Sequence, residues 1–346
     1  MKKYKMMTCL LLSVLVLSGC ESSSSVTENT TETEEVATDN ILVGFSQLGA
    51  ESDWRSANTQ SMKDAFSEEN GYGLIFNDGQ QKQTNQITAI RTFIQQDVDY
   101  IVLAPVTESG WDSVLEEAKD ANIPVILVDR LVDVSDKSLY QCWVGSDFEL
   151  EGIKVCQWLH EYTVANEISD EDLHIVDLQG TIGSTAQLGR SRGLNEVAME
   201  YGWDVVALRD ADFTQEKGRE VMASLLREYD NINVVYCEND NEAIGAIKAI
   251  EAAGLVAGKD IANGEIMVLS FDGINEEALQ YAREGKIACI GECNPMHGPR
   301  VAAMIEMLNR GEEPEKFNYV DEGIFSALPD VTTITVDGEE YAVTAP

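Results

Sequence analysis

From residue 41 onward, the chain alternates between short apolar runs typical of buried strands and longer runs with helical periodicity. Strands separated by helices of roughly ten to fifteen residues predict βαβ units, parallel sheets and right-handed crossovers. The first series has predicted strands at 41–46, 72–77, 100–104, 124–128 and 141–144, and helices at 54–70, 84–96 and 110–121. After a helix at 147–162, the second has strands at 173–178, 204–208, 233–236, 266–270 and 287–290, and helices at 185–201, 214–229, 241–253 and 275–284.

Two series of similar size predict an α/β protein with two doubly wound parallel-sheet lobes joined by a hinge. We place the first lobe at residues 41–143 plus 295–320 and the second at 144–294 plus 321–346. The tail from Phe317 onward contains a strand-like piece and could return to one of the lobes. The carboxyl ends of the strands in each lobe would face a shared cleft, which is where such sheets bind ligands.

Residues 1–20 resemble the signal peptide of a bacterial lipoprotein. Lysines precede an apolar run at 9–17 that is too short to span a bilayer, and Ser18 and Gly19 precede Cys20 in a pattern similar to a lipobox. The resemblance implies lipidation at Cys20 and an extracytoplasmic protein anchored to the cell membrane; the alternative is an ordinary cleaved signal with an incidental cysteine. Residues 21–40 are rich in Ser, Thr, Glu and Asp, and we interpret them as a disordered tether.

The charge of the chain argues against several function classes. Its net charge is −37, from 61 acidic and 24 basic residues, so nucleic-acid phosphates would be repelled. No Gly-x-Ser-x-Gly elbow, P-loop or Gly-x-Gly-x-x-Gly follows the first strand. Carboxylates across a cleft could hydrolyse a glycoside, but Arg130 beside Asp129 would keep that acid ionised. We therefore predict no enzyme and no cofactor.

The cysteines do not form a predicted disulfide framework or metal site. Without Cys9 and Cys20, an odd number remains: Cys142, Cys156, Cys237, Cys289 and Cys293. Cys289, Cys293 and His297 have the spacing of metal ligands, but a strand there would separate the two sulfurs by about 13 Å. With three histidines in the whole chain, we predict no metal site.

Polar residues follow the apolar runs at several predicted strand ends. Trp54 offers a flat apolar face and Arg55 a fork of donors, a combination that suits a sugar; the alternative is a core aromatic beside a solvated charge. The other strand ends carry Asp129-Arg130, Gln179-Gly180-Thr181 with Arg190 and Arg192 on the next helix, Asn239-Asp240 and Asp272-Gly273. Such carboxylates, amides and guanidiniums recognise polyols when they converge. Individually, an Asp here is often a turn residue or a helix cap, and Asp240 could cap the helix at 241–253.

Taken together, these motifs resemble the sugar-binding proteins of bacterial ABC importers, which have the type I periplasmic-binding-protein fold. The resemblance covers about residues 41–336 and is greatest for the galactofuranose-binding branch. It is carried by Ser52-Asp53-Trp54-Arg55, Asp78-Gly79-Gln80-Gln81-Lys82-Gln83, Ala104-Pro105-Val106 with Gly110-Trp111, Asp129-Arg130, Leu178-Gln179-Gly180-Thr181, Asp212-Phe213-Thr214, Asn239-Asp240 and Asp272-Gly273.

The resemblance implies a monosaccharide receptor that closes about its hinge, acts as a monomer and delivers its ligand to an ABC importer permease. A sensory receptor that docks on a chemoreceptor or sensor kinase is the alternative. Trp54 would stack on the sugar and Phe213 would form a second apolar wall. The implied sugar-binding residues are Ser52, Trp54, Arg55, Asp129, Arg130, Arg190, Phe213, Asn239, Asp272 and Glu292.

Overall fold

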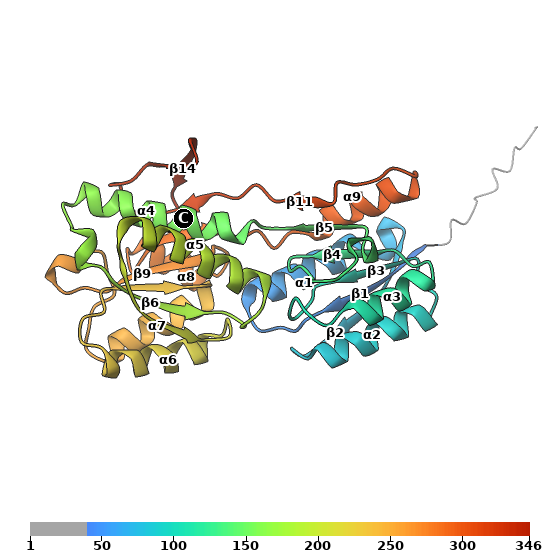
Figure 1. The fold of residues 1–346 in the computed structure, drawn as a ribbon, viewed down its shortest axis with the longest axis horizontal. Coiled ribbons are helices and arrows are strands. Elements are labelled where there is room, and N and C mark those ends of the chain that lie inside the picture. Colours follow the sequence, from blue (N-terminus) through green and yellow to red (C-terminus); the bar gives the residue numbers. More distant parts are fainter. Residues whose placement is uncertain (1–39) are drawn as a thin grey trace, which may run out of the picture. The chain divides into compact units, whose positions relative to one another are not determined.

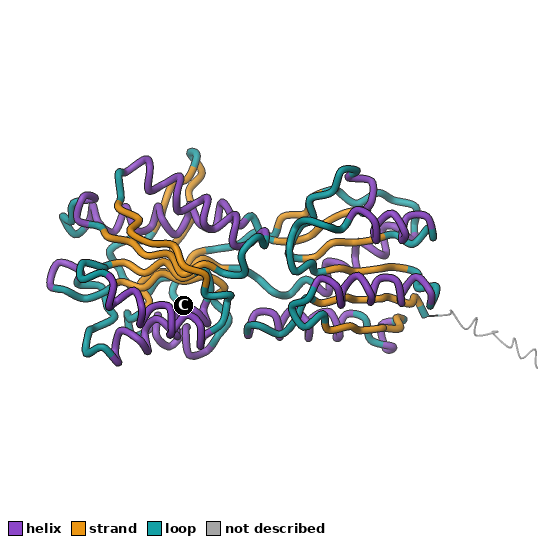
Figure 2. Tube along the Cα trace, turned by 60° about the horizontal axis from the view of Figure 1, so that its bottom comes forward, coloured by secondary structure: helices purple, strands orange, loops and turns teal. Residues whose placement is uncertain are grey.

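The computed structural model describes residues 40–346, in which the chain builds two sheets covered by helices (Figure 1 and Figure 2). The predicted signal peptide, the lipidation site Cys20 and nearly all of the predicted tether lie outside the described residues. Among the helices of residues 40–346, none combines the length and the apolar character that a membrane span needs.

The first sheet has six strands in the order β11-β5-β4-β3-β1-β2, and every neighbouring pair is parallel. Its strands are β1 (Ile41–Gln47), β2 (Tyr72–Asp78), β3 (Tyr100–Leu103), β4 (Val125–Val128), β5 (Cys142–Gly145) and β11 (Phe317–Tyr319). Helices α1 (Asp53–Ala65) and α9 (Gly298–Asn309) pack on one face, and α2 (Gln83–Gln95) and α3 (Asp112–Asp120) pack on the other. Because both faces are covered, β3 and β4 are apolar and buried at every position.

The second sheet has eight strands in the order β13-β14-β12-β10-β9-β8-β6-β7. Its strands are β6 (His174–Gln179), β7 (Asp204–Asp210), β8 (Val234–Cys237), β9 (Met267–Asp272), β10 (Ile287–Glu292), β12 (Ile324–Phe325), β13 (Thr333–Val336) and β14 (Glu339–Thr344). β6 to β10 are parallel, whereas β12 runs antiparallel to β10, and β13 and β14 form an antiparallel hairpin. Helices α4 (Phe148–Ala165) and α5 (Thr185–Tyr201) cover one face, and α6 (Gln215–Glu228), α7 (Asp240–Ala252) and α8 (Glu276–Arg283) cover the other.

These two parallel-sheet lobes confirm the predicted fold class. The chain passes between them at three crossovers, from β5 to α4, from β10 to α9 and from β11 to β12. The predicted boundaries at 294/295 and 320/321 fall in the second and third crossovers, whereas the one at 143/144 falls inside β5; the residue at which each lobe begins stays a prediction. At the second crossover, Gly298 lets α9 approach α1 closely, since a Cβ there would lie 2.1 Å from the backbone oxygen of Ser61.

Two predicted elements differ from the structure. The helix predicted at 54–70 ends at Ala65, because Phe66 leaves the helical backbone region and Ser67 is extended. A separate 3-10 turn, η1 (Glu68–Asn70), follows and ends at Gly71, whose φ is 82°. The tail does not return to one lobe alone: β11 extends the first sheet, and β12 to β14 extend the second.

Candidate ligand-binding site

A pocket of about 290 Å³ lies between side chains of both lobes. The pocket is lined by nine of the ten predicted site residues: Ser52, Trp54, Arg55, Asp129, Arg130, Arg190, Phe213, Asn239 and Asp272.

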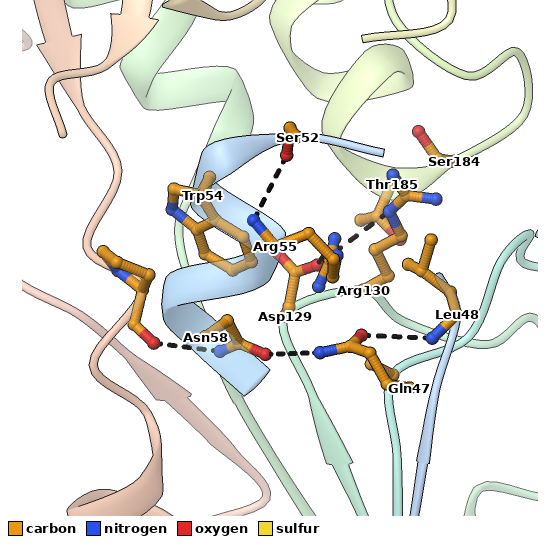
Figure 3. A network of polar contacts seen from close by, with 12 residues as sticks. Gln47, Leu48, Ser52, Trp54, Arg55, Asn58, Asp129, Arg130, Ser184 and Thr185 are labelled. Carbon is orange, nitrogen blue, oxygen red and sulfur yellow. Dashed lines mark hydrogen bonds and ion pairs between the residues drawn. The ribbon is translucent and has the colours of Figure 1, made fainter. Parts of the chain in front are cut away.

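The first turn of α1 presents Trp54 and Arg55 to the pocket (Figure 3). Ser52 caps this helix, since its Oγ accepts the backbone N–H of Arg55 at 3.2 Å. The indole Nε1 of Trp54 donates to the backbone oxygen of Cys293 at 2.7 Å, which joins α1 to the β10–α9 crossover. The indole plane is thereby held in one orientation and is 4% exposed.

Asn58, one turn further along α1, anchors the helix on both sides (Figure 3). Its Oδ1 accepts from Gln47 Nε2 at 3.0 Å, and its Nδ2 donates to the backbone oxygen of Pro295 at 2.9 Å. The neighbouring His297 is fully buried, and burial lowers its pKa to about 4, so its imidazole is neutral at pH 7. The end of β1, helix α1 and the second crossover therefore form one rigid support for Trp54 and Arg55.

Two guanidiniums and two carboxylates form a buried network in the first lobe. Arg55 Nη2 lies 2.6 Å from Asp129 Oδ2, and Arg55 Nε lies 3.0 Å from Glu51 Oε1. Arg130 shares Glu51 Oε1 at 3.7 Å and donates to the backbone oxygen of Val106 at 2.8 Å. Burial by itself lowers the pKa of Arg55, but Asp129 and Glu51 outweigh burial and raise it. Burial and the adjacent Arg55 lower the pKa of Arg130 to about 10, so both side chains stay charged at pH 7.

Three polar atoms of this network are buried and have no hydrogen-bond partner within the described residues. They are Arg55 Nη1, Arg130 Nε and Glu51 Oε2. An unpaired buried polar group costs roughly 1–3 kcal/mol, so such atoms are expected to be satisfied by something that enters the site. The set contains two donors and one acceptor, and a hydroxyl group can serve both kinds of atom.

Arg190 occupies the corresponding position in the second lobe. Its Nε lies 2.8 Å from Glu151 Oε2 and its Nη2 3.4 Å from Asp272 Oδ1, while Nη1 donates to the backbone oxygen of Glu238. Burial opposes ionisation of Arg190, but Glu151 and Asp272 raise its pKa well above the ordinary value. Burial raises the pKa of Asp272, and Arg190 opposes that shift. The pocket thus contains three arginines, each beside at least one carboxyl group.

Asn239 connects the helix cap of α7 to an apolar wall of the pocket. Its Oδ1 accepts the backbone N–H of Glu242 at 2.8 Å, and its Nδ2 donates to the backbone oxygen of Phe213 at 3.1 Å. The Phe213 ring packs in one cluster with Trp54 and Phe148. Asn239 thereby fixes the position of Phe213, while the second N–H of its amide is not used by either bond.

The alternative in which Asp240 caps this helix does not hold, because Asn239 is the cap of α7. The Asp240 carboxylate instead accepts the backbone N–H groups of Gly273, Ile274 and Asn275 at 3.0–3.1 Å. Burial raises the pKa of Asp240 to about 6. This side chain holds the loop that directly follows Asp272.

Three pocket residues adopt the left-handed backbone conformation: Asp129 at φ 64°, Phe213 at φ 59° and Asp272 at φ 90°. Residues other than glycine rarely do so, and each costs on the order of 1–3 kcal/mol. Asp129 and Asp272 stand at or just beyond the ends of β4 and β9, where this conformation turns the side chain toward the cleft. Strained backbone conformations of this kind are concentrated at binding sites, which agrees with a ligand site here.

Two residues considered in the sequence lie outside the pocket. Glu292 was predicted to bind the sugar, but its Oε2 accepts the backbone N–H of Gly323 at 2.8 Å and it lines a separate cavity. Because side chains alternate along a strand, Glu292 faces away from the pocket while the next residue, Cys293, faces it. Arg192 is exposed and pairs with Glu149 at 3.3 Å, whereas Arg190, two positions earlier, points inward.

The sequence reasoning missed four residues that line the pocket: Glu51, Phe148, Ala186 and Cys293. Glu51 stands four residues before Arg55, and this spacing across the helix start could have revealed it. Phe148 lies shortly after the end of β5, just as Asp129 lies directly after the end of β4. Ala186 and Cys293 carry no chemical signal that a single sequence offers.

The five cysteines of the described residues are all buried and unpaired. The oxygen and sulfur atoms of Glu151, Cys293 and Glu322 lie within 4.8 Å of one another. Glu151 is already paired with Arg190, and Lys154 Nζ lies 2.9 Å from the backbone oxygen of Glu322, so two cations are close. We assign no metal ligands among the described residues.

The model of the periplasmic binding protein domain matches residues 43–313. The galactofuranose-binding protein YtfQ of Escherichia coli K12 is 41% identical over 295 residues, which cover 84% of this chain and 88% of that protein. The resemblance to the galactofuranose-binding branch is thereby confirmed.

Solved structures show the same similarity. A protein of Mycobacterium smegmatis in complex with β-D-fucofuranose is 38% identical, with a TM-score of 0.78 over 83% of this chain and 91% of that one. The binding protein of the arabinose ABC transporter of Shewanella sp. ANA-3, bound to L-arabinofuranose, is 38% identical, with a TM-score of 0.76 over 83% and 92%. With these relatives and the matched domain model, this chain belongs to the periplasmic binding protein domain family, whose members similar to it are sugar-binding proteins of ABC importers.

Proposed function

We propose that this chain is an extracytoplasmic receptor that captures a monosaccharide, galactofuranose, galactose or a related sugar, and delivers it to the permease of an ABC importer. The observation that carries the proposal is the pocket, in which buried arginines and carboxyl groups of both lobes meet aromatic walls. A sugar has this same combination of hydroxyl groups around a ring with apolar C–H faces.

Each part of the pocket has a role in this proposal. Trp54 and Phe213 pack against the apolar faces of the ring. Arg55 and Arg130 donate to hydroxyl oxygens through the nitrogen atoms that lack partners, and Glu51 accepts from a hydroxyl group. The second lobe contributes donors and acceptors from Arg190 and Asp272. Ser52 and Asn239 act chiefly by holding Arg55 and Phe213.

Closure about the hinge is the proposed mechanism. A ligand that contacts both lobes binds the closed state better and so increases its population. Contacts across the cleft support this mechanism: the backbone N–H of Leu131 donates to Thr185 Oγ1 at 2.8 Å, and Asp53 Oδ2 accepts from Asn241 Nδ2 at 3.3 Å and from Asn275. These bonds are exposed or half-buried, as expected of contacts that form and break.

The remaining parts of the proposal concern location and partners. Lipidation of Cys20 would hold the receptor at the membrane, and residues 21–40 would give it reach toward a permease. The protein would act as a monomer and without a catalytic step. In support of the latter, the pocket carboxylate Asp129 is held by Arg55 in an ion pair at 2.6 Å.

A thermal-shift screen against galactofuranose, galactose, arabinose, ribose and fructose tests the proposal. One or more of these sugars should raise the melting temperature, because about 2.7 kcal/mol of stabilisation is expected at 100 times the dissociation constant. Arg55→Ala should abolish the shift. Arg91→Ala, which removes an exposed arginine of the same lobe, is the matched control and should keep it. Absence of a shift with every sugar, in protein freed of bound ligand by refolding, would contradict the proposal.

A further inference from the structure

The three crossovers between the lobes meet at one carboxyl group, that of Glu322. Its Oε1 accepts from Ser146 Oγ at 2.8 Å and from the backbone N–H of Asn294 at 2.6 Å. Ser146 belongs to the β5–α4 crossover, Asn294 to the β10–α9 crossover, and Glu322 itself to the β11–β12 crossover. A single side chain therefore ties together every connection about which the lobes can move.

A second carboxyl group, Glu151 in α4, lies against the first. Oxygen atoms of Glu151 and Glu322 and the sulfur of Cys293 lie within 4.8 Å of one another. Glu151 Oε2 is paired with Arg190, whereas Glu151 Oε1 is buried without a hydrogen-bond partner among residues 40–346. Glu151 and Glu322 are only 4% and 6% exposed. Two adjacent carboxyl groups in such a site are rarely both ionised, and one retains a proton.

The surrounding charges do not remove this conflict. From α4 and the turn before it, Lys154 donates to the backbone oxygen of Glu322, and Asp147 lines the same cavity. From β10 and its end, Glu292 accepts from Gly323, and Cys293 adds a thiol. From α5, Arg190 is already shared among Glu151, Asp272 and a backbone oxygen. Asp321 adds a further acid next to Glu322 in the chain.

The two groups respond differently to this environment. Burial, followed by the neighbouring Glu151, raises the pKa of Glu322 to about 9. Arg190 counteracts the effect of burial on the pKa of Glu151, which is raised nonetheless. These directions favour Glu322 as the group that keeps a proton at neutral pH, and Glu151 Oε1, which has no hydrogen-bond partner among residues 40–346, is available to accept it.

We propose that Glu322 is a neutral carboxylic acid that donates its proton to Glu151, and that this shared proton locks the three crossovers and links them to Arg190 in the pocket. The linked chain runs from Ser146 and Asn294 through Glu322, Glu151 and Arg190 to Asp272. When the proton leaves, two neighbouring anions repel each other at the hinge and the closed arrangement loosens. The inference does not depend on which ligand the pocket binds.

Nuclear magnetic resonance of the wild-type protein labelled with ¹³C at the glutamate carboxyl carbon tests the protonation state. The Glu322 signal, identified by its loss in Glu322→Gln, should titrate with a midpoint near pH 9; burial also raises the pKa of Glu238 and Glu242, but their signals should remain in that variant. Glu313→Gln, at an exposed glutamate nine residues earlier, is the control and should leave it in place. A Glu322 signal that titrates at the usual pH of an exposed glutamate would overturn the proposal, and this result needs only the wild-type fold.

Small-angle scattering tests the effect on the hinge. The radius of gyration of the wild-type protein should increase between pH 7.5 and pH 9.5, whereas Glu322→Gln, which keeps an uncharged donor, should show no such increase. The variant retains every lysine and arginine, so the difference isolates the one carboxyl group. Equal expansion of both proteins would overturn the link to the hinge. A zinc-induced thermal shift that Glu322→Gln removes would also overturn the proposal, since the cluster would then hold a cation instead of a proton.

Discussion

At the scale of single residues, the arginines of the pocket depend on buried partners. Arg55 is held by Asp129 at 2.6 Å and by Glu51 at 3.0 Å, and all three side chains are almost inaccessible to solvent. A charge in such a place is tolerated only while its counter-charge is present. Residues that never touch a ligand can therefore decide whether the binding residues keep their positions.

Asp129→Asn should lower the free energy of unfolding by about 3–5 kcal/mol, because it leaves the Arg55 charge buried with Glu51 alone. Urea denaturation at pH 7 measures this loss. Glu117→Gln is the matched control: it removes the carboxylate of the exposed Arg91 pair, and a change of at most about 1 kcal/mol is expected. Equal changes in the two variants would mean that the buried ion pair contributes no more to the free energy of unfolding than the exposed one.

Asp177→Asn should become progressively more stable than the wild type between about pH 4 and pH 8. Burial raises the pKa of Asp177 to about 8, and the hydrogen bond from Ser191 only partly opposes that shift. The folded state therefore holds a proton that the unfolded chain has lost above about pH 3.9, and folding stability falls as pH rises, by at most about 1.4 kcal/mol per pH unit.

Unfolding free energies of the wild type and of Asp177→Asn at pH 5, 6.5 and 8 measure this difference. The exposed Asp230→Asn serves as the control and should follow the wild type at each pH. A constant difference between the wild type and Asp177→Asn across this range would show that Asp177 does not retain its proton.

At the scale of secondary-structure elements, the site is assembled by helix starts and strand ends. Asn239 caps α7 and also holds Phe213, so the boundary of one helix fixes an aromatic wall. Ser52 likewise caps α1, and its hydroxyl oxygen thereby holds the backbone N–H of Arg55 at the start of that helix. Substitutions at these caps should affect both stability and ligand binding.

Asn239→Ala should destabilise the protein by about 1–2 kcal/mol, since it removes the cap of α7 and leaves the backbone oxygen of Phe213 unpaired. Asn239→Ser keeps an oxygen that can cap the helix but lacks the donor to Phe213, so its loss should be smaller. Urea denaturation of both variants compares the two effects. A serine variant as unstable as the alanine variant would argue that the Phe213 contact, and not the cap, dominates.

The elements themselves were largely predictable. Buried parallel strands such as β3 and β4 are continuous apolar runs, and the parallel order that follows from alternating helices brings their polar ends together. The early end of α1 at Ala65 was not predictable, because the helical periodicity continues past it and local backbone geometry ends the helix. The direction of Glu292 depends on the side of β10 that its side chain occupies, which a single apolar run does not reveal.

At the scale of the whole molecule, the described state has its two lobes in direct contact at the pocket rim. Asp53 in the first lobe faces Asn241 and Asn275 in the second, and Leu131 faces Thr185. Together with the bond from the Glu108 backbone N–H to the Gly183 backbone oxygen at 3.3 Å, they are among the contacts that must break when the lobes separate. Hinge closure by a ligand requires that the open and closed states be close in free energy before the ligand binds.

Asp53→Ala combined with Thr185→Val should shift the unliganded protein toward an open state, because it removes the side-chain bonds from Asn241 and Asn275 to Asp53 and the bond from Leu131 to Thr185. Small-angle scattering should show a larger radius of gyration, while urea denaturation should show little change within the lobes. Asp64→Ala, at an exposed position on the same helix as Asp53, should leave the radius unchanged. An unchanged radius in the double variant would mean that other contacts hold the lobes together.

A crystal structure of the protein grown with galactofuranose, or with the sugar that gives the largest thermal shift, tests most directly whether the pocket is the binding site. We expect one monosaccharide between Trp54 and Phe213, with hydroxyl groups bonded to Arg55 and Arg190. That arrangement would assign partners to Arg55 Nη1 and Glu51 Oε2, which lack them now. A sugar bound elsewhere, for example in the groove beside β2, with the pocket occupied by water alone, would contradict this assignment.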